Sequence, residues 1–253
     1  AASNAIVVTV NPIPPTPTIT AGGAITFCQG GSVTLTSNAA SGNQWYKDGI
    51  IIGGSTATTL IVTTSGSYTT IVTSGGCQSA ASNAIVVTVN SIPPTPVITA
   101  GGAITFCQGG SVTLTSNAAS GNQWYKDGIA IGGSTATTLI VTTSGSYTTI
   151  VTLSGCVSAA SNTIIVTVIP IPPTPTITAT GNILQSSAVS GNQWFLNNVS
   201  ISGATNQLYT VQASGLYTVQ VTLNGCSSIS AVFNFVATAV INPPALSYDV
   251  VLF

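Results

Sequence analysis

Charged side chains, the groups that most often move protons in enzymes, gather at one recurring stretch of this chain. SGNQWYKDG occupies residues 41–49 and again 120–128 of the 253 residues. A lysine beside an aspartate could act as an acid and base pair, so the stretch is the first candidate for a catalytic site. Its two copies hold four of the five charged residues, namely Lys47, Asp48, Lys126 and Asp127.

A third copy of the stretch argues against catalysis. SGNQWFLNN at residues 190–198 keeps Trp194 but has Leu196 and Asn197 where the other copies have Lys and Asp. Asp-Gly and Asn-Asn share a tolerance of positive φ, which a tight hairpin turn requires. The chain has no His, and Asp249 is its only other carboxylate side chain. We therefore predict a strand and a turn here, with no catalytic, cofactor-binding or metal-binding residues.

The overall composition excludes several classes of partner. Only 2% of the residues are charged, against roughly 25% in an ordinary globular protein, and the net charge is -1. Such a chain has no field to attract nucleic acid. Thr, Ser and Gly interrupt each apolar run before the roughly 18 residues that indicate a membrane-spanning helix. We therefore expect neither nucleic acid as a partner nor a membrane-spanning protein.

The sequence is built from a repeated unit. Residues 12–90 and 91–169 are identical at 70 of 79 positions, and residues 170–236 form a diverged third unit that lacks nine residues and one cysteine. Residues 1–11 are identical to residues 80–90, so we interpret them as the last strand of a preceding, absent repeat or as a donated strand. We interpret residues 237–253 as a C-terminal tail that departs from the repeat.

Each unit alternates apolar and polar residues with the period of a β-strand and never with that of a helix. Val, Ile, Thr and Tyr dominate, and GG, DG and SG pairs mark turns. This pattern predicts about seven short strands in each unit and an all-β fold of tandem sandwiches. The IPPTP segments between units are semi-rigid spacers, so we expect the sandwiches to form an extended rod.

The aromatic residues of each unit resemble those of an immunoglobulin-like domain. Trp45 in mid-strand matches its core Trp, and Tyr68 after Ser-Gly-Ser matches its tyrosine corner. One difference is that Thr70 stands where immunoglobulins have a cysteine. The equivalent predicted core residues are Trp124, Trp194, Tyr147 and Tyr217.

The order of motifs FC.GGSVTLT, QWYKDG, SGSY and GC.S resembles the small immunoglobulin-like repeats of large secreted and surface proteins of Bacteroidetes. This resemblance implies an extracellular, adhesin-like stalk without catalysis, on a protein exported as type IX secretion cargo. The ending SYDVVLF looks like the first strand of the sorting domain of such proteins.

The cysteines favour an oxidising compartment. Cys28 and Cys77 are separated by 49 residues, as are Cys107 and Cys156, which predicts one disulfide inside each unit. A metal site is the rival interpretation, but neither His nor a CxxC pair accompanies them. Cys226 lacks a partner on this interpretation, so we expect an unpaired thiol there, or an intermolecular disulfide. Disulfides place the chain outside the cell or at its surface.

Three functions follow from these features. The first is a non-catalytic structural stalk or spacer, able to assemble with copies of itself because its strands lack the charges that usually protect sheet edges. The second is a filament subunit joined through residues 1–11 as a donated strand. The third is a module that binds a surface glycan or polymer through Tyr46, Tyr125 and Phe195, which should point away from the core.

Overall fold

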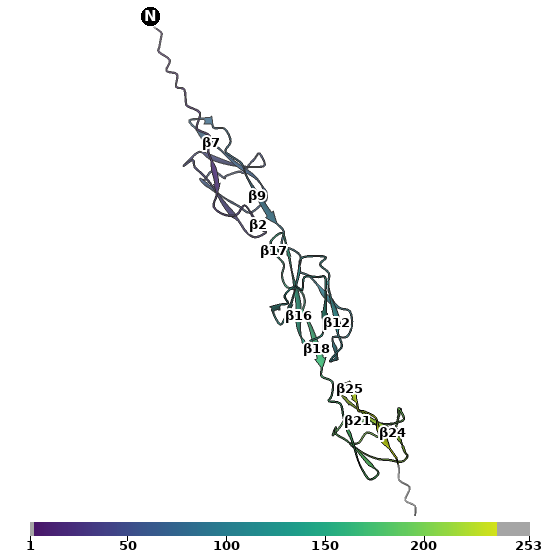
Figure 1. Ribbon diagram of the computed structural model, residues 1–253. Helices are drawn as coiled ribbons and strands as arrows, with labels where there is room; N and C mark the ends of the chain where they lie inside the picture. The colour runs from purple at the N-terminus through teal and green to yellow at the C-terminus, as the bar shows by residue number, and fades with distance from the viewer. Residues whose placement is uncertain (1–2, 237–253) are drawn as a thin grey trace, which may run out of the picture. The chain divides into compact units, whose positions relative to one another are not determined.

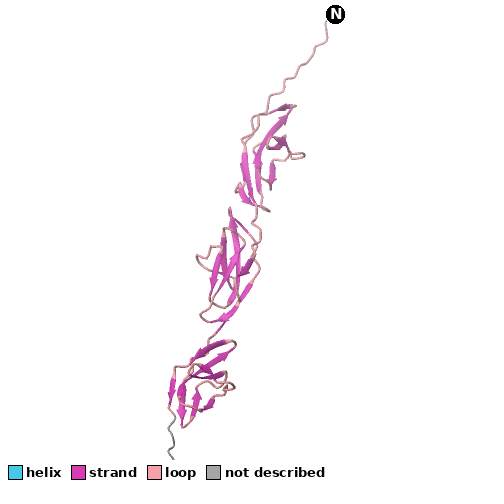
Figure 2. Ribbon diagram, turned by 90° about the vertical axis from the view of Figure 1, so that its right-hand side faces the viewer, coloured by secondary structure: helices cyan, strands magenta, loops and turns pink. Residues whose placement is uncertain are grey.

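The computed structural model describes residues 3–236, and each of its elements in this range is a β-strand (Figure 2). The strands of each repeat form a three-stranded sheet and a larger sheet. This result confirms the predicted all-β, tandem sandwich fold. The chain divides into two compact units, one made of described residues up to 101 with 113–139 and 146–164, the other of 102–112, 140–145 and residues from 165 onward. The repeat boundaries given above remain a prediction.

The first sandwich pairs a sheet of order β1-β3-β6 with a larger sheet of order β2-β9-β7-β4-β5, in which β8 also pairs with β7. Residues alternate between buried and exposed along β3, as a strand with one face on the core requires. Its nine strands are more numerous than the seven expected, because two hairpin arms of two residues each count separately. They are β1 Ile19–Ala21, β2 Thr26–Cys28, β3 Val33–Ser37, β4 Asn43–Lys47, β5 Ile50–Ile51, β6 Thr59–Val62, β7 Gly66–Ser74, β8 Cys77–Gln78 and β9 Ile85–Asn90 (Figure 1).

The second sandwich repeats these elements and their order. Its sheets run β10-β12-β15 and β11-β18-β16-β13-β14, with β17 paired to β16. The strands are β10 Ile98–Ala100, β11 Thr105–Cys107, β12 Val112–Ser116, β13 Asn122–Lys126, β14 Ile129–Ala130, β15 Thr138–Val141, β16 Gly145–Leu153, β17 Cys156–Val157 and β18 Ile164–Ile169.

The third sandwich lacks one strand in its described residues. Its sheets run β19-β20-β23 and β22-β21-β24-β25, with β26 paired to β24. The nine-residue deletion removes the counterpart of β2 and β11, so β19 turns directly into β20. The strands are β19 Ile177–Thr180, β20 Ile183–Ser186, β21 Asn192–Leu196, β22 Val199–Ser200, β23 Leu208–Thr210, β24 Gly215–Leu223, β25 Cys226–Ile229 and β26 Phe233–Phe235.

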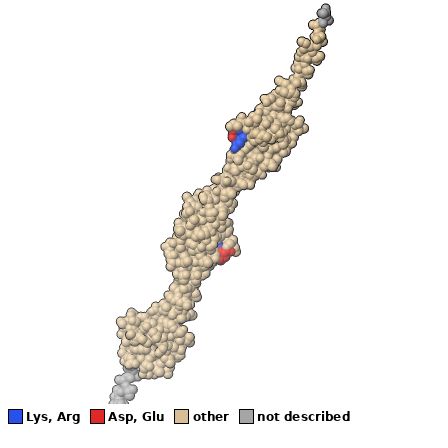
Figure 3. Space-filling view, turned by 180° about the vertical axis from the view of Figure 1, so that it is seen from behind, with Lys and Arg blue, Asp and Glu red and all other residues tan. Residues whose placement is uncertain are grey.

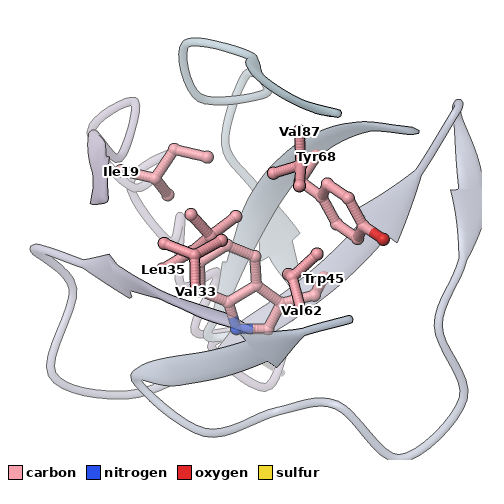
Figure 4. Close-up of a cluster of buried hydrophobic side chains, with 7 residues drawn as sticks. All are labelled: Ile19, Val33, Leu35, Trp45, Val62, Tyr68 and Val87. Atoms are coloured by element: carbon pink, nitrogen blue, oxygen red, sulfur yellow. The ribbon is translucent and has the colours of Figure 1, made fainter. Parts of the chain in front are cut away.

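The core of each sandwich is built around its tryptophan, as predicted. Trp45, Trp124 and Trp194 are all 0% exposed. The indole of Trp45 donates a hydrogen bond of 2.9 Å to the carbonyl oxygen of Ala57, so its one polar atom is satisfied inside the core. In the first sandwich the surrounding cluster is Ile19, Val33, Leu35, Val62, Tyr68 and Val87 (Figure 4).

The tyrosine corner is also present. The hydroxyl of Tyr68 donates to the carbonyl oxygen of Thr64 at 2.9 Å, and that of Tyr217 donates to Ala213 at 2.8 Å. Tyr147 is buried at the equivalent position. In the first and third sandwiches this bond to the backbone four residues upstream fixes the loop before the longest strand.

Residues 3–11 form no strand, although their sequence is that of β9 and the residues before it. Val87 on β9 is 1% exposed, whereas the equivalent Val8 is 79% exposed. The segment therefore presents the side chains of a sandwich strand without the sheet that would bury them. The predicted sorting-domain start at residues 237–253 lies outside the described residues.

Candidate functional site: cysteine junctions between consecutive repeats

The charged stretch around Lys47 and Asp48 forms a turn, as predicted. Asp48 has a φ of 48°, in the left-handed region. Its carboxylate accepts a hydrogen bond of 2.8 Å from the backbone N–H of Ser67. In the third repeat Asn197 has a φ of 49°, and its amide oxygen accepts the same bond from Leu216 at 3.0 Å. An uncharged oxygen replaces the carboxylate, so the acid has a structural role there.

The remaining surface offers little for catalysis. Figure 3 shows the Lys and Asp side chains at one spot on each of the first two repeats, with uncharged residues elsewhere on the visible face of the described chain. Each repeat also has an open hollow beside its paired prolines, and none of the residues that line these hollows is charged. Among residues 3–236, no three His, Cys, Asp or Glu side chains lie close enough together to hold a metal ion.

The first cysteine of a repeat lies at the end of its last strand. Strand β2 runs parallel to β9, with Thr26 opposite Thr88 and Cys28 opposite Asn90. The N–H of Gln29 donates to the carbonyl oxygen of Asn90 at 2.8 Å and extends this pairing. Because β9 leads directly into the proline linker, Cys28 lies where the chain leaves the sandwich.

The second cysteine of a repeat directly follows a hairpin turn. In the second repeat Ser154 and Gly155 have φ values of 50° and 78°, the pair of positive angles that a type I′ turn requires. Cys156 comes next and pairs with Leu153 across the hairpin of β16 and β17. The turn therefore presents the cysteine at the tip of the longest strand.

A disulfide joins the first cysteine of repeat 1 to the second cysteine of repeat 2. Cys28 is bonded to Cys156, with a Cα–Cα distance of 5.6 Å and a sequence separation of 128. Noncovalent contacts accompany the bond: the amide of Asn90 donates to the carbonyl oxygen of Ser154 at 2.9 Å, and the Cys156 sulfur lies 3.8 Å from the carbonyl oxygen of Asn90. The proline linker is thus closed by a covalent bond and a hydrogen bond.

The second junction has the same design. Cys107 lies opposite Ile169 at the end of β11 and is bonded to Cys226, with a Cα–Cα distance of 5.7 Å and a sequence separation of 119. The Cys226 sulfur lies 3.9 Å from the carbonyl oxygen of Ile169. Loops of this length give about 5 kcal/mol of stabilisation per bond when the chain-entropy relation is applied to each alone.

The predicted disulfides within each repeat are therefore wrong. Strand β9 pairs with β7 so that Val87 lies opposite Gly66, the first residue of β7. Asn90, and Cys28 opposite it, therefore lie beyond that end of β7. Cys77 follows the opposite end of the same nine-residue strand. Eight rises of about 3.3 Å separate those ends by roughly 26 Å, and a disulfide needs Cα atoms less than about 7 Å apart. The same geometry excludes a bond between Cys107 and Cys156.

The predicted unpaired cysteine is also corrected. Cys226 is 1% exposed and bonded to Cys107, whereas the free thiol of the chain is Cys77, which is half-buried. Sequence reasoning assigned the unpaired thiol to the repeat that had lost a cysteine. With bonds between repeats, the cysteine lost from repeat 3 is the one that would have bonded a further repeat.

Comparison with known proteins gives one family. The sequence model described as "Ig-like domain CHU_C associated" matches residues 14–90 and 93–170, which is more than half of the chain. No curated protein matches. Solved structures that match include murine CEACAM1b, 20% identical with a TM-score of 0.39. They also include a mouse coronavirus receptor-binding domain complexed with its murine receptor, 18% identical with a TM-score of 0.43. Each match covers 60% of this chain and 100% of the other.

Proposed function

The chain belongs to the family of Ig-like domains associated with CHU_C, and from this premise we propose that it is the stalk or spacer region of a secreted, surface-exposed, adhesin-like protein. Tandem Ig-like domains serve as structural or binding repeats, and all-β domains of this family are typically not enzymes. In this proposal the chain has no catalytic role and holds another part of its protein away from a surface.

The observation that carries the proposal is the bonding of each repeat to the next. Each proline linker is bridged by one disulfide, Cys28–Cys156 or Cys107–Cys226. The bridge reduces the number of conformations that the linker can adopt. A binding module needs a stable fold but not a conformationally restricted linker. A spacer, in contrast, benefits from such a linker, because the linker helps to fix the distance between its two ends. Disulfides also favour an oxidising location outside the cell. No helix in residues 3–236 is long and apolar enough to cross a membrane.

Small-angle X-ray scattering tests this role. The oxidised chain should have a narrower distribution of interatomic distances than the double variant Cys28→Ser, Cys156→Ser, because the variant frees one linker while each sandwich keeps its core. The variant Cys77→Ser, which breaks no disulfide, is the matched control. Equal distributions for the oxidised chain and the double variant would remove the reason for assigning a spacer role.

Residues 3–11 favour a second candidate, a filament joined by a donated strand. Ile6, Val7 and Val10 are between 87% and 89% exposed, and apolar side chains of a strand gain by adding to the sheet of a neighbouring molecule. Removing residues 1–11 should then abolish filaments seen by electron microscopy. Filaments that persist without this segment would eliminate the donated strand.

The third candidate is glycan or polymer binding by Tyr46 and its equivalents. Tyr46, Tyr125 and Phe195 are half-buried, next to the fully buried tryptophans, so part of each ring is open to a ligand. In a pull-down on insoluble polysaccharide, the chain should bind and the double variant Tyr46→Ala, Tyr125→Ala should not. Retention that is equal for both chains would rule out these rings as the binding surface.

A further inference from the structure

The free thiol of Cys77 occupies the same position as two cysteines that are bonded. It follows the hairpin turn of Gly75 and Gly76, both with positive φ, and pairs with Ser74 across the hairpin. Cys156 and Cys226 follow equivalent turns in the next two repeats, and both form disulfides with the preceding repeat. Cys77 therefore has the local structure of a cysteine that receives a bond from the repeat before it.

A second observation is the contact made by Asn11. Its amide donates to the carbonyl oxygen of Gly75, at 2.6 Å, and the Cys77 thiol donates to the carbonyl oxygen of Asn11 at 3.6 Å. These contacts reproduce those of Asn90, which bonds Ser154 at 2.9 Å and lies 3.8 Å from the Cys156 sulfur. The end of the segment 3–11 is thus held against Cys77 as β9 is held against its junction.

We propose that Cys77 is the bonding position for the FCQG cysteine of a further copy of this repeat, joined ahead of residues 1–11. In the first repeat Cys28 is placed by its pairing with Asn90, the residue equivalent to Asn11. A copy completed by residues 1–11 would place its own FCQG cysteine opposite Asn11, beside Cys77. This inference rests on the proposed function, since it extends the same bonding by one repeat.

The bond forms by thiol–disulfide exchange with a disulfide oxidant such as oxidised glutathione. The Cys77 thiolate attacks the oxidant and releases one glutathione thiolate, which leaves a mixed disulfide. The incoming cysteine thiolate then attacks the Cys77 sulfur and releases the second glutathione thiolate. The two protein thiols lose two protons and two electrons, and the oxidant is reduced to two glutathione molecules.

The test is a four-repeat chain in which a copy of residues 12–79 precedes residue 1. It is oxidised with glutathione, alkylated and mapped without reductant by mass spectrometry. In the three-repeat chain nearly all Cys77 should be alkylated or bonded to glutathione, and in the four-repeat chain this fraction should fall to near zero. The Cys77 equivalent in the added copy should carry the alkyl or glutathione group instead. Replacing the added FCQG cysteine by Ser should restore the alkyl or glutathione group at Cys77.

Two results would overturn the proposal. One is a disulfide between the two cysteines of the added copy, with Cys77 still alkylated. The other is a Cys77 that stays alkylated, or bonded to glutathione, when the second cysteine of the added copy is changed to Ser to prevent that pairing. The same maps report Cys28 with Cys156 and Cys107 with Cys226. If those links are present, only this inference fails, whereas their absence would also remove the proposed function.

Discussion

The first and third repeats solve the same packing problem with different residues. In the first, β2 brings Phe27 against the core and carries Cys28 to the next repeat. The third repeat has no such strand, and aromatic residues replace aliphatic ones on the strands that remain. Relative to the first repeat, Tyr209 stands in the register position of Leu60, Phe233 in that of Ile85 and Phe235 in that of Val87.

The aromatic residues of the third repeat contact one another and its tryptophan. The rings of Trp194 and Tyr209 are stacked with centroids 5.8 Å apart, and those of Tyr217 and Phe235 form a T-shaped pair with centroids 6.4 Å apart. Such pairs add about 0.5–1.5 kcal/mol beyond the area they bury. Tyr209, Phe233 and Phe235 pack against the buried core of the third repeat, in which β2 has no counterpart. The third repeat therefore keeps a packed core although it lacks the strand and the cysteine that would bond a following repeat.

The largest expected effect separates bonds between repeats from bonds within them. The double variant Cys107→Ser, Cys226→Ser keeps Cys28, Cys77 and Cys156. Cleavage after Lys47 and Lys126 gives three fragments, and the structure requires the first and third to remain linked, with the second alkylated at Cys77. Mass spectrometry without reductant reads this out. A link between the first and second fragments would mean that Cys28 pairs with Cys77 inside repeat 1, which would contradict bonding between repeats.

The next effect concerns the aromatic cover of the third repeat. Phe235→Ala should lower the free energy of opening of β21 and β24 by about 2 kcal/mol, because it removes a half-buried ring that packs against Tyr217. Hydrogen exchange of these strands measures the loss. Val236→Ala is the control, since this side chain is 71% exposed and should cost nothing measurable. Unchanged exchange in Phe235→Ala would mean that the ring does not substitute for β2.

The reverse exchange should harm the first repeat. Val87→Phe places a ring where Phe27 and Val89 already pack, and overpacking costs about 1–3 kcal/mol. Combining it with Phe27→Ala should recover part of the loss, measured as hydrogen exchange of β7 and β9. If the two changes destabilise the repeat additively, the ring at position 87 does not occupy the space left by Phe27. Phe235 would then not be a replacement for Phe27 in the third repeat.

A smaller effect distinguishes the turn from the charge at Asp48. Asp48→Asn should change stability by less than about 0.5 kcal/mol, because Asn197 forms the same turn and bond in the third repeat. Asp48→Ala should cost about 1–2 kcal/mol, since Ala tolerates positive φ poorly and leaves the Ser67 N–H without its acceptor. Urea titration measures both. Equal losses in the two variants would show that the charge itself matters.

The smallest effect is a pH dependence of the third repeat. Burial, with a lesser contribution from Tyr209, raises the pKa of Tyr217 above its ordinary value. The folded state therefore keeps its proton where the unfolded chain loses it, so stability is full below about pH 10 and falls as pH rises further. The urea midpoint, followed by circular dichroism between about pH 10 and 11, should fall less steeply for Tyr217→Phe. Parallel slopes would contradict this assignment.

Much of the fold could be predicted from local patterns. Period-two alternation, the buried Trp and the tyrosine corner are properties of single strands and their turns, so one unit contains them in full. The positive φ at Asp48 was predictable for the same reason, because Asp-Gly and Asn-Asn report backbone chemistry directly. The tandem sandwiches followed from the repetition of these signals.

The cysteine pairing could not be found from spacing alone. In a periodic array, pairs within units and pairs between units recur with the same period, so the separation of 49 residues from Cys28 to Cys77 did not discriminate between them. The deciding fact is three-dimensional: the two cysteines of one repeat lie at opposite ends of β7. One sequence signal favoured bonds between repeats. Repeat 3 lacks its first cysteine but keeps Cys226, which is expected if Cys226 pairs with a cysteine of the preceding repeat.

The two disulfides overlap along the chain, and this overlap has a mechanical consequence. Under tension applied to its two ends, an unbonded chain of 253 residues could be drawn out to about 860 Å at ~3.4 Å per residue. With both bonds intact, the shortest covalent path crosses each of them and contains roughly 106 residues, which limits the contour length to about 360 Å. After complete unfolding of all three sandwiches, the bonded chain could thus extend to less than half of the contour length of the unbonded chain. The path runs from residue 1 to Cys28, across to Cys156, backwards to Cys107, across to Cys226 and on to residue 253.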